Sequence, residues 1–378
     1  MKNLKIIIVF SGILIAFAGC NSCNQQKRNE TIKIGAILPL TGNSAVWGIP
    51  TKEGIELAVE QYNSKIGING KKIEIIFEDT KGEPKTGVTA AEKLITTDKV
   101  VALLDNSNSS ITLAVAPTIE KNKIPLMVTG ASSPKITQAG EYVYRIWNSD
   151  ALEGELMGNF AYDSLKVKKC CILYVNNNYG EGLKGVFTEF FSKRGGNIIS
   201  EESFQEDGSD FRTQVSNVIN SKPDAVYLVC YPKQGAILLK QLKELNYNKI
   251  LLGAVAFEDP DLIKLSGNAA EGLIYPLPAP VDTTNSIYES FSAAYKAKFN
   301  KQLPFLADVG YDGFNILIKA IENAKSLDGD KIKLELDKIQ NFEGVSGNIS
   351  FDKNGDVHKH FGMRIVKNNS PIWLYKQL

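Results

Sequence analysis

The chain has 378 residues, a length that gives a prior of two to three domains and ample room for a hydrophobic core. Its 43 Lys and Arg against 42 Asp and Glu leave a formal charge of +1 without blocks of like charge, which argues against nucleic acid or an anionic membrane surface as partner. With 43% hydrophobic and 22% charged residues, the composition is that of an ordinary globular protein. We therefore expect a neutral or small partner.

The N-terminal segment indicates export. Lys2 and Lys5 precede an apolar run over residues 6–18, which is the charged and hydrophobic pattern of a secretory signal. The run is too short to span a membrane as a helix. We predict a signal peptide over residues 1–19.

A cysteine follows this segment directly. Phe17, Ala and Gly stand before Cys20, which resembles the lipobox of bacterial lipoproteins, although that pattern usually has Leu where this chain has Phe17. The resemblance implies that Cys20 is lipidated and that residues 20–30, which are polar and lack apolar periodicity, form a lipidated tether to the membrane. The alternative is a chance cysteine beside an ordinary cleavage site.

From residue 31 the chain alternates apolar strands with helices. Strands are predicted over residues 32–38, 73–77, 100–104, 124–128, 171–175, 198–203, 225–230 and 250–253. Helices are predicted over residues 53–62, 86–97, 110–121, 152–165, 181–193, 211–220 and 236–245. Continuous apolar strands between helices are typical of parallel sheets buried on both faces. The pattern predicts the α/β class, with two doubly wound lobes joined by crossovers near residues 147–150 and 275–280.

The last hundred residues change character. Helices are predicted over residues 286–299, 311–325 and 331–339, and a terminal β-meander over residues 347–351, 361–366 and 372–375 with a turn at 352–355. We assign residues 31–149 and 277–345 to an N-terminal lobe, and residues 150–276 and 346–378 to a C-terminal lobe. The two lobes would be joined by a hinge.

Catalytic and metal-binding patterns are missing from the sequence. The two histidines, His358 and His360, have no clustered ligands near them, and no nucleophile motif, phosphate loop or dinucleotide fingerprint is present. We expect no enzyme, no metal and no cofactor. Cys170 and Cys171 fall in a predicted strand and are interpreted as buried thiols, while Cys230 could reach one of them, so a disulfide stays open.

Two loops at the carboxyl ends of predicted strands carry polar chemistry. One places Ser109 and Ser110 at a helix start, where free N–H groups and hydroxyls can hold a carboxylate, and the other is the small-residue segment 129–134. Open α/β sheets bind their ligands at this edge. The alternative is that both loops are ordinary caps and turns.

Several segments of the chain, in order and spacing, resemble the leucine/isoleucine/valine-binding proteins, which are type I periplasmic solute-binding proteins of ABC transporters. The matching segments are Ile-Lys-Ile-Gly-Ala-Ile-Leu-Pro-Leu-Thr-Gly at 32–42 and residues 47–48, 52–58, 67–71, 78–80, 109–112, 124–125, 133–137, 179–182 and 311–312. The resemblance covers essentially the whole mature length. It implies two lobes that close on a small ligand, as in a Venus flytrap.

The resemblance also implies a set of ligand-binding residues. In that family a serine of one loop, with a backbone carbonyl and a hydroxyl of the next, holds the ligand's carboxylate and amine; these positions fall on Ser109, Gly130 and Ser132. Aromatic positions supply the rest of the wall. The full predicted set is Trp47, Ser109, Gly130, Ala131, Ser132, Tyr179, Tyr231, Val255 and Tyr311.

One position departs from the family pattern. Val255 stands where the family has the acidic partner of the ligand ammonium, and a buried ammonium without a carboxylate is costly. Glu258, Asp259 and Asp312 are candidates for a displaced acid. The alternative is a ligand without an α-amine.

The expected function is that of a monomeric extracytoplasmic solute-binding lipoprotein, which captures an amino acid-like ligand and delivers it to the permease of a branched-chain amino acid type ABC transporter. A hydrolase is disfavoured because no base accompanies a nucleophile. A sensor lobe shares the fold, and so does a binder of an amine-free carboxylate or amide; both stay open as alternatives.

Overall fold

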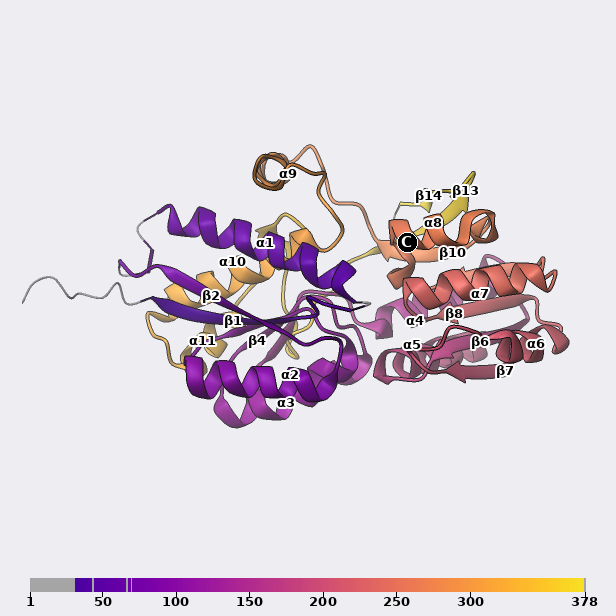
Figure 1. Ribbon diagram of the computed structural model, residues 1–378, viewed down its shortest axis with the longest axis horizontal. Coiled ribbons are helices and arrows are strands. Elements are labelled where there is room, and N and C mark those ends of the chain that lie inside the picture. Colours follow the sequence, from indigo (N-terminus) through magenta and orange to yellow (C-terminus); the bar gives the residue numbers. More distant parts are fainter. Residues whose placement is uncertain (1–30, 43, 66, 69, 377–378) are drawn as a thin grey trace, which may run out of the picture.

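The computed structural model describes residues 31–42, 44–65, 67–68 and 70–376. The predicted signal peptide, Cys20 and the tether lie outside these residues. Figure 1 shows the rest of the chain as two α/β lobes side by side, each built on its own sheet, which confirms the predicted fold class. Among the described helices, none combines the length and the apolar composition that crossing a membrane requires.

The first lobe contains a five-stranded parallel sheet in the order β2-β1-β3-β4-β5. Its strands are β1 (Ile32–Leu38), β2 (Ile73–Asp79), β3 (Leu103–Asp105), β4 (Leu126–Val128) and β5 (Val143–Arg145). Its helices are α1 (Ala45–Asn63), α2 (Pro84–Lys93), α3 (Ser109–Asn122), α9 (Ser286–Phe299), α10 (Ala307–Ala324) and α11 (Gly329–Leu336). The helices α1 and α10 pack together on one side of the sheet, and α2 and α3 pack together on the other (Figure 1). The central strands are buried on both faces, which is why they are mostly apolar, with Lys33 of β1 and Asp105 of β3 as the exceptions.

The second lobe contains a seven-stranded sheet in the order β14-β13-β10-β9-β8-β6-β7. Its strands are β6 (Lys169–Val175), β7 (Asn197–Phe204), β8 (Ala225–Val229), β9 (Ile250–Gly253), β10 (Ile274–Pro278), β13 (Phe361–Lys367) and β14 (Ser370–Tyr375). Its helices are α4 (Asp150–Asp163), α5 (Asn178–Lys193), α6 (Arg212–Asn220), α7 (Pro232–Glu244) and α8 (Pro260–Ser266). The strands β6 to β10 are parallel, whereas β13 runs antiparallel to both β10 and β14.

The predicted terminal β-meander is wrong in its first strand. The strand β12 (Gly347–Ile349) pairs with β11 (Phe342–Gly344) in a separate two-stranded ribbon, and the turn at 352–355 does not join it to β13 as a hairpin. The segment between β12 and β13 instead passes from one lobe to the other (Figure 1). The strands β13 and β14 form the edge of the second sheet, as the hairpin part of the prediction requires.

The connections between the lobes lie against one another. The side-chain amide of Asn148, in the segment before α4, bonds both the backbone N–H and the backbone carbonyl of Lys359 at 2.9 Å. Beside this contact, the Nε of Arg145 donates to a carboxylate oxygen of Asp356 at 2.8 Å, in an ion pair that is almost fully buried. These contacts tie two of the crossing segments together. The residue boundaries assigned to the two lobes stay a prediction.

Candidate binding site between the lobes

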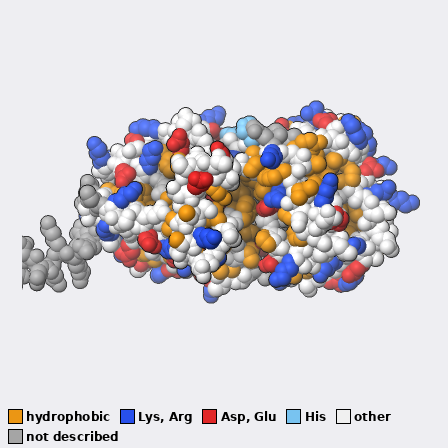
Figure 2. Space-filling model, turned by 90° about the horizontal axis from the view of Figure 1, so that it is seen from above, with side chains coloured by type: hydrophobic (Ala, Val, Ile, Leu, Met, Phe, Trp, Pro, Cys, Tyr) orange, Lys and Arg blue, Asp and Glu red, His pale blue; other side chains and the backbone are white. Residues whose placement is uncertain are grey.

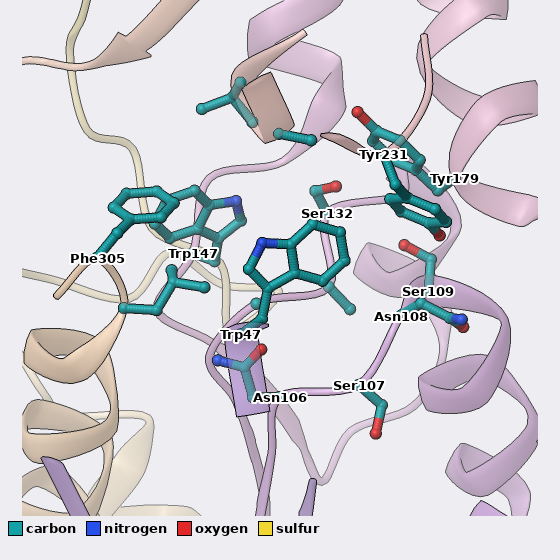
Figure 3. A pocket seen from close by; sticks show the side chains of 15 residues that line it. Trp47, Asn106, Ser107, Asn108, Ser109, Ser132, Trp147, Tyr179, Tyr231 and Phe305 are labelled. Carbon is teal, nitrogen blue, oxygen red and sulfur yellow. The ribbon is translucent and has the colours of Figure 1, made fainter. Parts of the chain in front are cut away.

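A partly open cavity of about 540 Å³, its mouth included, lies where the two lobes meet. Figure 2 shows hydrophobic side chains gathered around the groove between the lobes, and Figure 3 shows the residues of the cavity. The cavity is lined by Trp47, Asn106, Ser107, Asn108, Ser109, Gly130, Ala131, Ser132, Trp147, Tyr179, Tyr231, Val255, Ala256, Phe305 and Leu306. Eight of the nine residues predicted from the sequence are in this set, and Tyr311 is not.

The first lobe contributes a polar edge at the start of α3. Asn108 caps this helix by accepting a hydrogen bond from the N–H of Ile111 at 3.1 Å, so Ser109 occupies the first turn. The hydroxyl oxygen of Ser109 accepts from the N–H of Ser133 at 3.1 Å, which leaves its own proton free to donate. A helix N-terminus with a free hydroxyl proton favours a negatively charged group of a ligand.

The loop after β4 completes this edge. A Cβ atom on Gly130 would approach the side-chain oxygen of Asn106 to 2.3 Å, so glycine is the residue that fits. Asn106 is fixed in turn because its amide donates to the hydroxyl of Thr51 at 2.5 Å. Ser132 lines the cavity together with Ser109, and its hydroxyl also lies near the buried carboxyl of Asp150 (Figure 3).

The second lobe contributes an aromatic wall. The side chain of Asn177 accepts from the N–H of Tyr179 at 3.1 Å and so places Tyr179 in the first turn of α5. Tyr231 is extended directly before Pro232, the first residue of α7. The two tyrosine rings stack at a centroid distance of 5.4 Å, and Trp47 of the first lobe meets Tyr231 edge-on at 5.2 Å. Burial raises the pKa of both tyrosines, so their hydroxyls stay neutral.

The other end of the cavity is closed by residues that the sequence did not predict as site residues. Trp147, in the segment before α4, packs edge-on against Phe305 at a centroid distance of 5.7 Å. Leu306, which follows, has a φ of 71°, in the left-handed region that non-glycine residues seldom adopt. For this end of the cavity, the one indication in the sequence was that Trp147 lies in a predicted crossover between the lobes.

Tyr311 is a correction to the predicted site. It lies in α10, where its hydroxyl donates to the side-chain oxygen of Gln61 at 2.6 Å and its ring packs against Phe291 at 4.7 Å. Both neighbours belong to helices of the first lobe, α1 and α9. Tyr311 therefore holds these helices together and does not reach the cavity.

None of the three acids considered as replacements at Val255 lines the cavity. Glu258 accepts hydrogen bonds from Tyr275 at 2.7 Å and from Arg364 at 2.5 Å, on the far side of its loop. Asp259 caps α8, and Asp312 accepts from two backbone N–H groups of the segment between β11 and β12. Burial raises the pKa of Asp312 to about 6. The cavity lining thus carries no charged side chain.

The two lobes also touch beside the cavity. The hydroxyl of Ser110, in α3, accepts from the backbone N–H of Asn178 at 3.2 Å and from its side-chain amide at 3.3 Å. Lys135 donates to the side-chain oxygen of Asn178 at 3.3 Å. The start of α5 is therefore held against two segments of the first lobe.

Metal and thiol chemistry are not assembled in the described part of the chain. No group of three or more His, Cys, Asp or Glu side chains there could hold a metal ion. The thiols of Cys170, Cys171 and Cys230 are buried and free, and burial raises the pKa of each, so none is a reactive thiolate.

Two α/β lobes with a polar edge facing an aromatic wall define a solute-binding protein of the two-lobe type. The family model described as periplasmic binding protein matches residues 31–370, and the chain belongs to this family. The predicted resemblance to leucine/isoleucine/valine-binding proteins is confirmed by the relatives described next.

Three relatives illustrate the range of ligands. The leucine-, isoleucine-, valine-, threonine- and alanine-binding protein of Pseudomonas aeruginosa is 26% identical over 94% of this chain and 95% of its own. A leucine-binding protein from Thermotoga maritima, known from its crystal structure, is 33% identical in sequence and superposes with a TM-score of 0.85. The match covers 91% of this chain and 97% of that protein. An ABC transporter solute-binding protein from Rhodopseudomonas palustris, in complex with 3,4-dihydroxybenzoic acid, is 27% identical with a TM-score of 0.80, over 91% and 96%.

Proposed function

We propose that this protein is an extracytoplasmic solute-binding protein that captures a small amino acid-like ligand between two closing lobes and delivers it to an ABC transporter permease. The observation that carries the proposal is the cavity between the lobes, with hydroxyls and a helix N-terminus on one side and stacked tyrosines on the other. The polar edge suits a carboxylate, and the aromatic residues suit an apolar side chain.

The proposed order of binding steps follows from the fact that the polar edge belongs to the first lobe and the two stacked tyrosines belong to the second lobe. The ligand docks on the first lobe, where Ser109 and Ser132 donate to its carboxylate and Gly130 lines the cavity beside them. The second lobe then closes, bringing Tyr179 and Tyr231 onto the ligand. Closure makes the contacts between Trp47 and Tyr231 and between Ser110 and Asn178, and it reshapes the outer surface that a permease would contact.

Lipidation of Cys20 would keep the protein at the membrane that holds the permease, and we propose that it acts there as a monomer. Branched-chain amino acids are the proposed ligand class, because two of the relatives are named for binding them. The complex of the third relative with an aromatic acid makes an amine-free aromatic carboxylate the second candidate.

A thermal-shift panel on the purified protein tests this proposal. The panel contains the common amino acids, their amides, and short-chain and aromatic carboxylates, since a ligand that binds the folded protein raises its melting temperature. A saturable shift with leucine, isoleucine or valine is the expected result. Absence of a shift with every compound would refute small-solute capture, and a shift with amine-free acids alone would reassign the ligand class.

A further inference from the structure

Two carboxylates are buried directly behind the wall of the cavity without a bonded cation. Asp150 and Glu153, in the first turn of α4, are 0% and 1% exposed. Within the described part of the chain, neither carboxylate oxygen of Asp150 has a hydrogen-bond partner of good geometry, although the Ser132 hydroxyl lies near enough to lower the pKa of this carboxyl. Burial of unpaired carboxylates is costly, so a pair of them at this place calls for an explanation.

Three residues of the cavity lining surround this pair. The N–H of Asp150 donates to the carbonyl of Ser132 at 2.8 Å, and the N–H of Val255 donates to a carboxylate oxygen of Glu153 at 2.9 Å. Tyr179 is 5% exposed and its buried hydroxyl has no hydrogen-bond partner among the described residues. Asp150 and Glu153 therefore lie directly behind the cavity lining: Asp150 contacts Ser132 of the polar edge, and Glu153 contacts Val255.

Charged and titratable groups from other elements do not neutralise the pair. The positive charge of Arg145, in β5, lowers the pKa of Asp150. The guanidinium, however, forms its hydrogen bonds with Asp356 and with the carbonyls of Ser132 and Ser133. The remaining groups that face the pair are neutral hydroxyls. One is the hydroxyl of Ser132, which lowers the pKa of Asp150, and the others belong to Tyr179, Tyr227 and Tyr231.

We propose that Glu153, with Asp150 beside it, supplies the counter-charge for an ammonium group of the ligand. This inference rests on the proposed function and names the residue that would select α-amino acids over amine-free carboxylates or amides. Val255 stands where the family has an acid, and Glu153 reaches from α4 to the backbone of that same residue. The negative charge is thus present at the site, delivered by a different element.

The pair also gives binding a dependence on pH. Burial raises the pKa of Asp150 to about 7 and that of Glu153 well above its ordinary value, and the charge of Asp150 further disfavours ionisation of Glu153. An ammonium would stabilise the ionised pair, so binding releases protons that the empty protein holds below about pH 7. The affinity for an amino acid therefore rises as the pH increases through this range and falls as it decreases.

Matched ligand pairs and matched variants test the proposal. The probes are the α-amino acids leucine, valine and phenylalanine, each paired with the α-hydroxy acid of the same side chain, measured by isothermal titration calorimetry between pH 6 and pH 8. The variants are Glu153→Gln and the control Glu155→Gln, which removes the same charge from an exposed position of the same helix. We expect the wild type to prefer the amino acids, and Glu153→Gln to lose at least tenfold in their affinity and to show a weaker pH dependence, because Asp150 still titrates in the variant. Glu155→Gln should behave as wild type.

A second measurement separates this role from a structural one. In the absence of ligand, Glu153→Gln should melt a few degrees higher than wild type at pH 8, because it removes a charge that burial disfavours. A merely structural acid would lower the melting temperature when it is replaced. Unchanged amino acid affinity in Glu153→Gln, or equal binding of the hydroxy acids to the wild type, overturns the inference and leaves solute capture standing. If no calorimetric probe and no compound of the thermal-shift panel binds, both the role of Glu153 and the proposed solute capture are overturned.

Discussion

Ser109→Ala is the sharpest test of the polar edge. The hydroxyl of Ser109 accepts from the N–H of Ser133 at 3.1 Å and lines the cavity with its proton free. The substitution therefore removes one donor to the ligand carboxylate and one acceptor within the first lobe. It leaves the N-cap of α3 intact, because Asn108 provides that cap.

The size of the effect follows from the two lost hydrogen bonds. A hydrogen bond to a charged group contributes about 1.5–3 kcal/mol, so the affinity for a carboxylate ligand should fall by roughly 10- to 150-fold. The bond to Ser133 joins two neutral groups, so the free energy of unfolding should fall by about 0.5–1.5 kcal/mol. The expected outcome is a folded protein with a specific defect in binding.

Calorimetry with L-leucine, or with benzoate if the thermal-shift panel selects an aromatic acid, measures the first quantity, and urea denaturation measures the second. Ser221→Ala is the matched control, since it too removes one hydrogen bond between a serine hydroxyl and the backbone, here donated to the carbonyl of Asn217, but at the end of α6, away from the cavity. Affinity within twofold of the wild type in Ser109→Ala would refute the assignment of this serine as a carboxylate donor.

Three further substitutions test other parts of the structure. Tyr311→Phe should leave ligand affinity unchanged and lower the free energy of unfolding by about 0.5–1.5 kcal/mol, because it loses one hydrogen bond to α1; a tenfold loss of affinity would contradict its placement outside the cavity. Asn178→Ala removes side-chain contacts to Ser110 and Lys135, so we expect a severalfold weaker affinity and a larger radius of gyration by small-angle scattering. Asp356→Ala leaves the buried charge of Arg145 unpaired and should destabilise the protein by about 3–5 kcal/mol in urea denaturation, whereas a loss below 1 kcal/mol would argue against the buried ion pair.

The fold could be predicted for strands that are buried on both faces, because burial requires their residues to be apolar. The strands β1, β6 and β8 lie in the interior of their lobes and are apolar apart from Lys33 in β1 and Lys169 at the start of β6, so their residues identify them directly. The short strand β5 and the proline-containing strand β10 gave no such signal. The strand β10 contains Pro276 and Pro278 and was interpreted as a crossover, yet it pairs with β9 and β13.

The site could be predicted where it consists of loops with a family pattern, and not where it depends on distant segments meeting. Ser109, Gly130 and Ser132 follow neighbouring strands, so the parallel sheet alone brings them together. Phe305 reaches Trp147 from a segment more than 150 residues later in the chain, and no local pattern announces such a contact. Tyr311 fails for the same reason, because its direction is set by packing against α1 and α9.

In this protein the acidic residue Glu153 lies behind the cavity lining and not in it. This arrangement bears on how the ligand specificity of the fold can change. The lining is uncharged, and in the proposed binding mode the carboxylate of a ligand would meet a helix N-terminus whose polarity comes from the backbone. Any carboxylate can use that pole, which is consistent with relatives that bind amino acids or an aromatic acid. Discrimination then depends on the second pole. Since Glu153 lies behind the wall, it can favour an ammonium without narrowing the space that the aromatic residues offer to the side chain. Charge selectivity and side-chain selectivity would thus be set by different residues and could change independently.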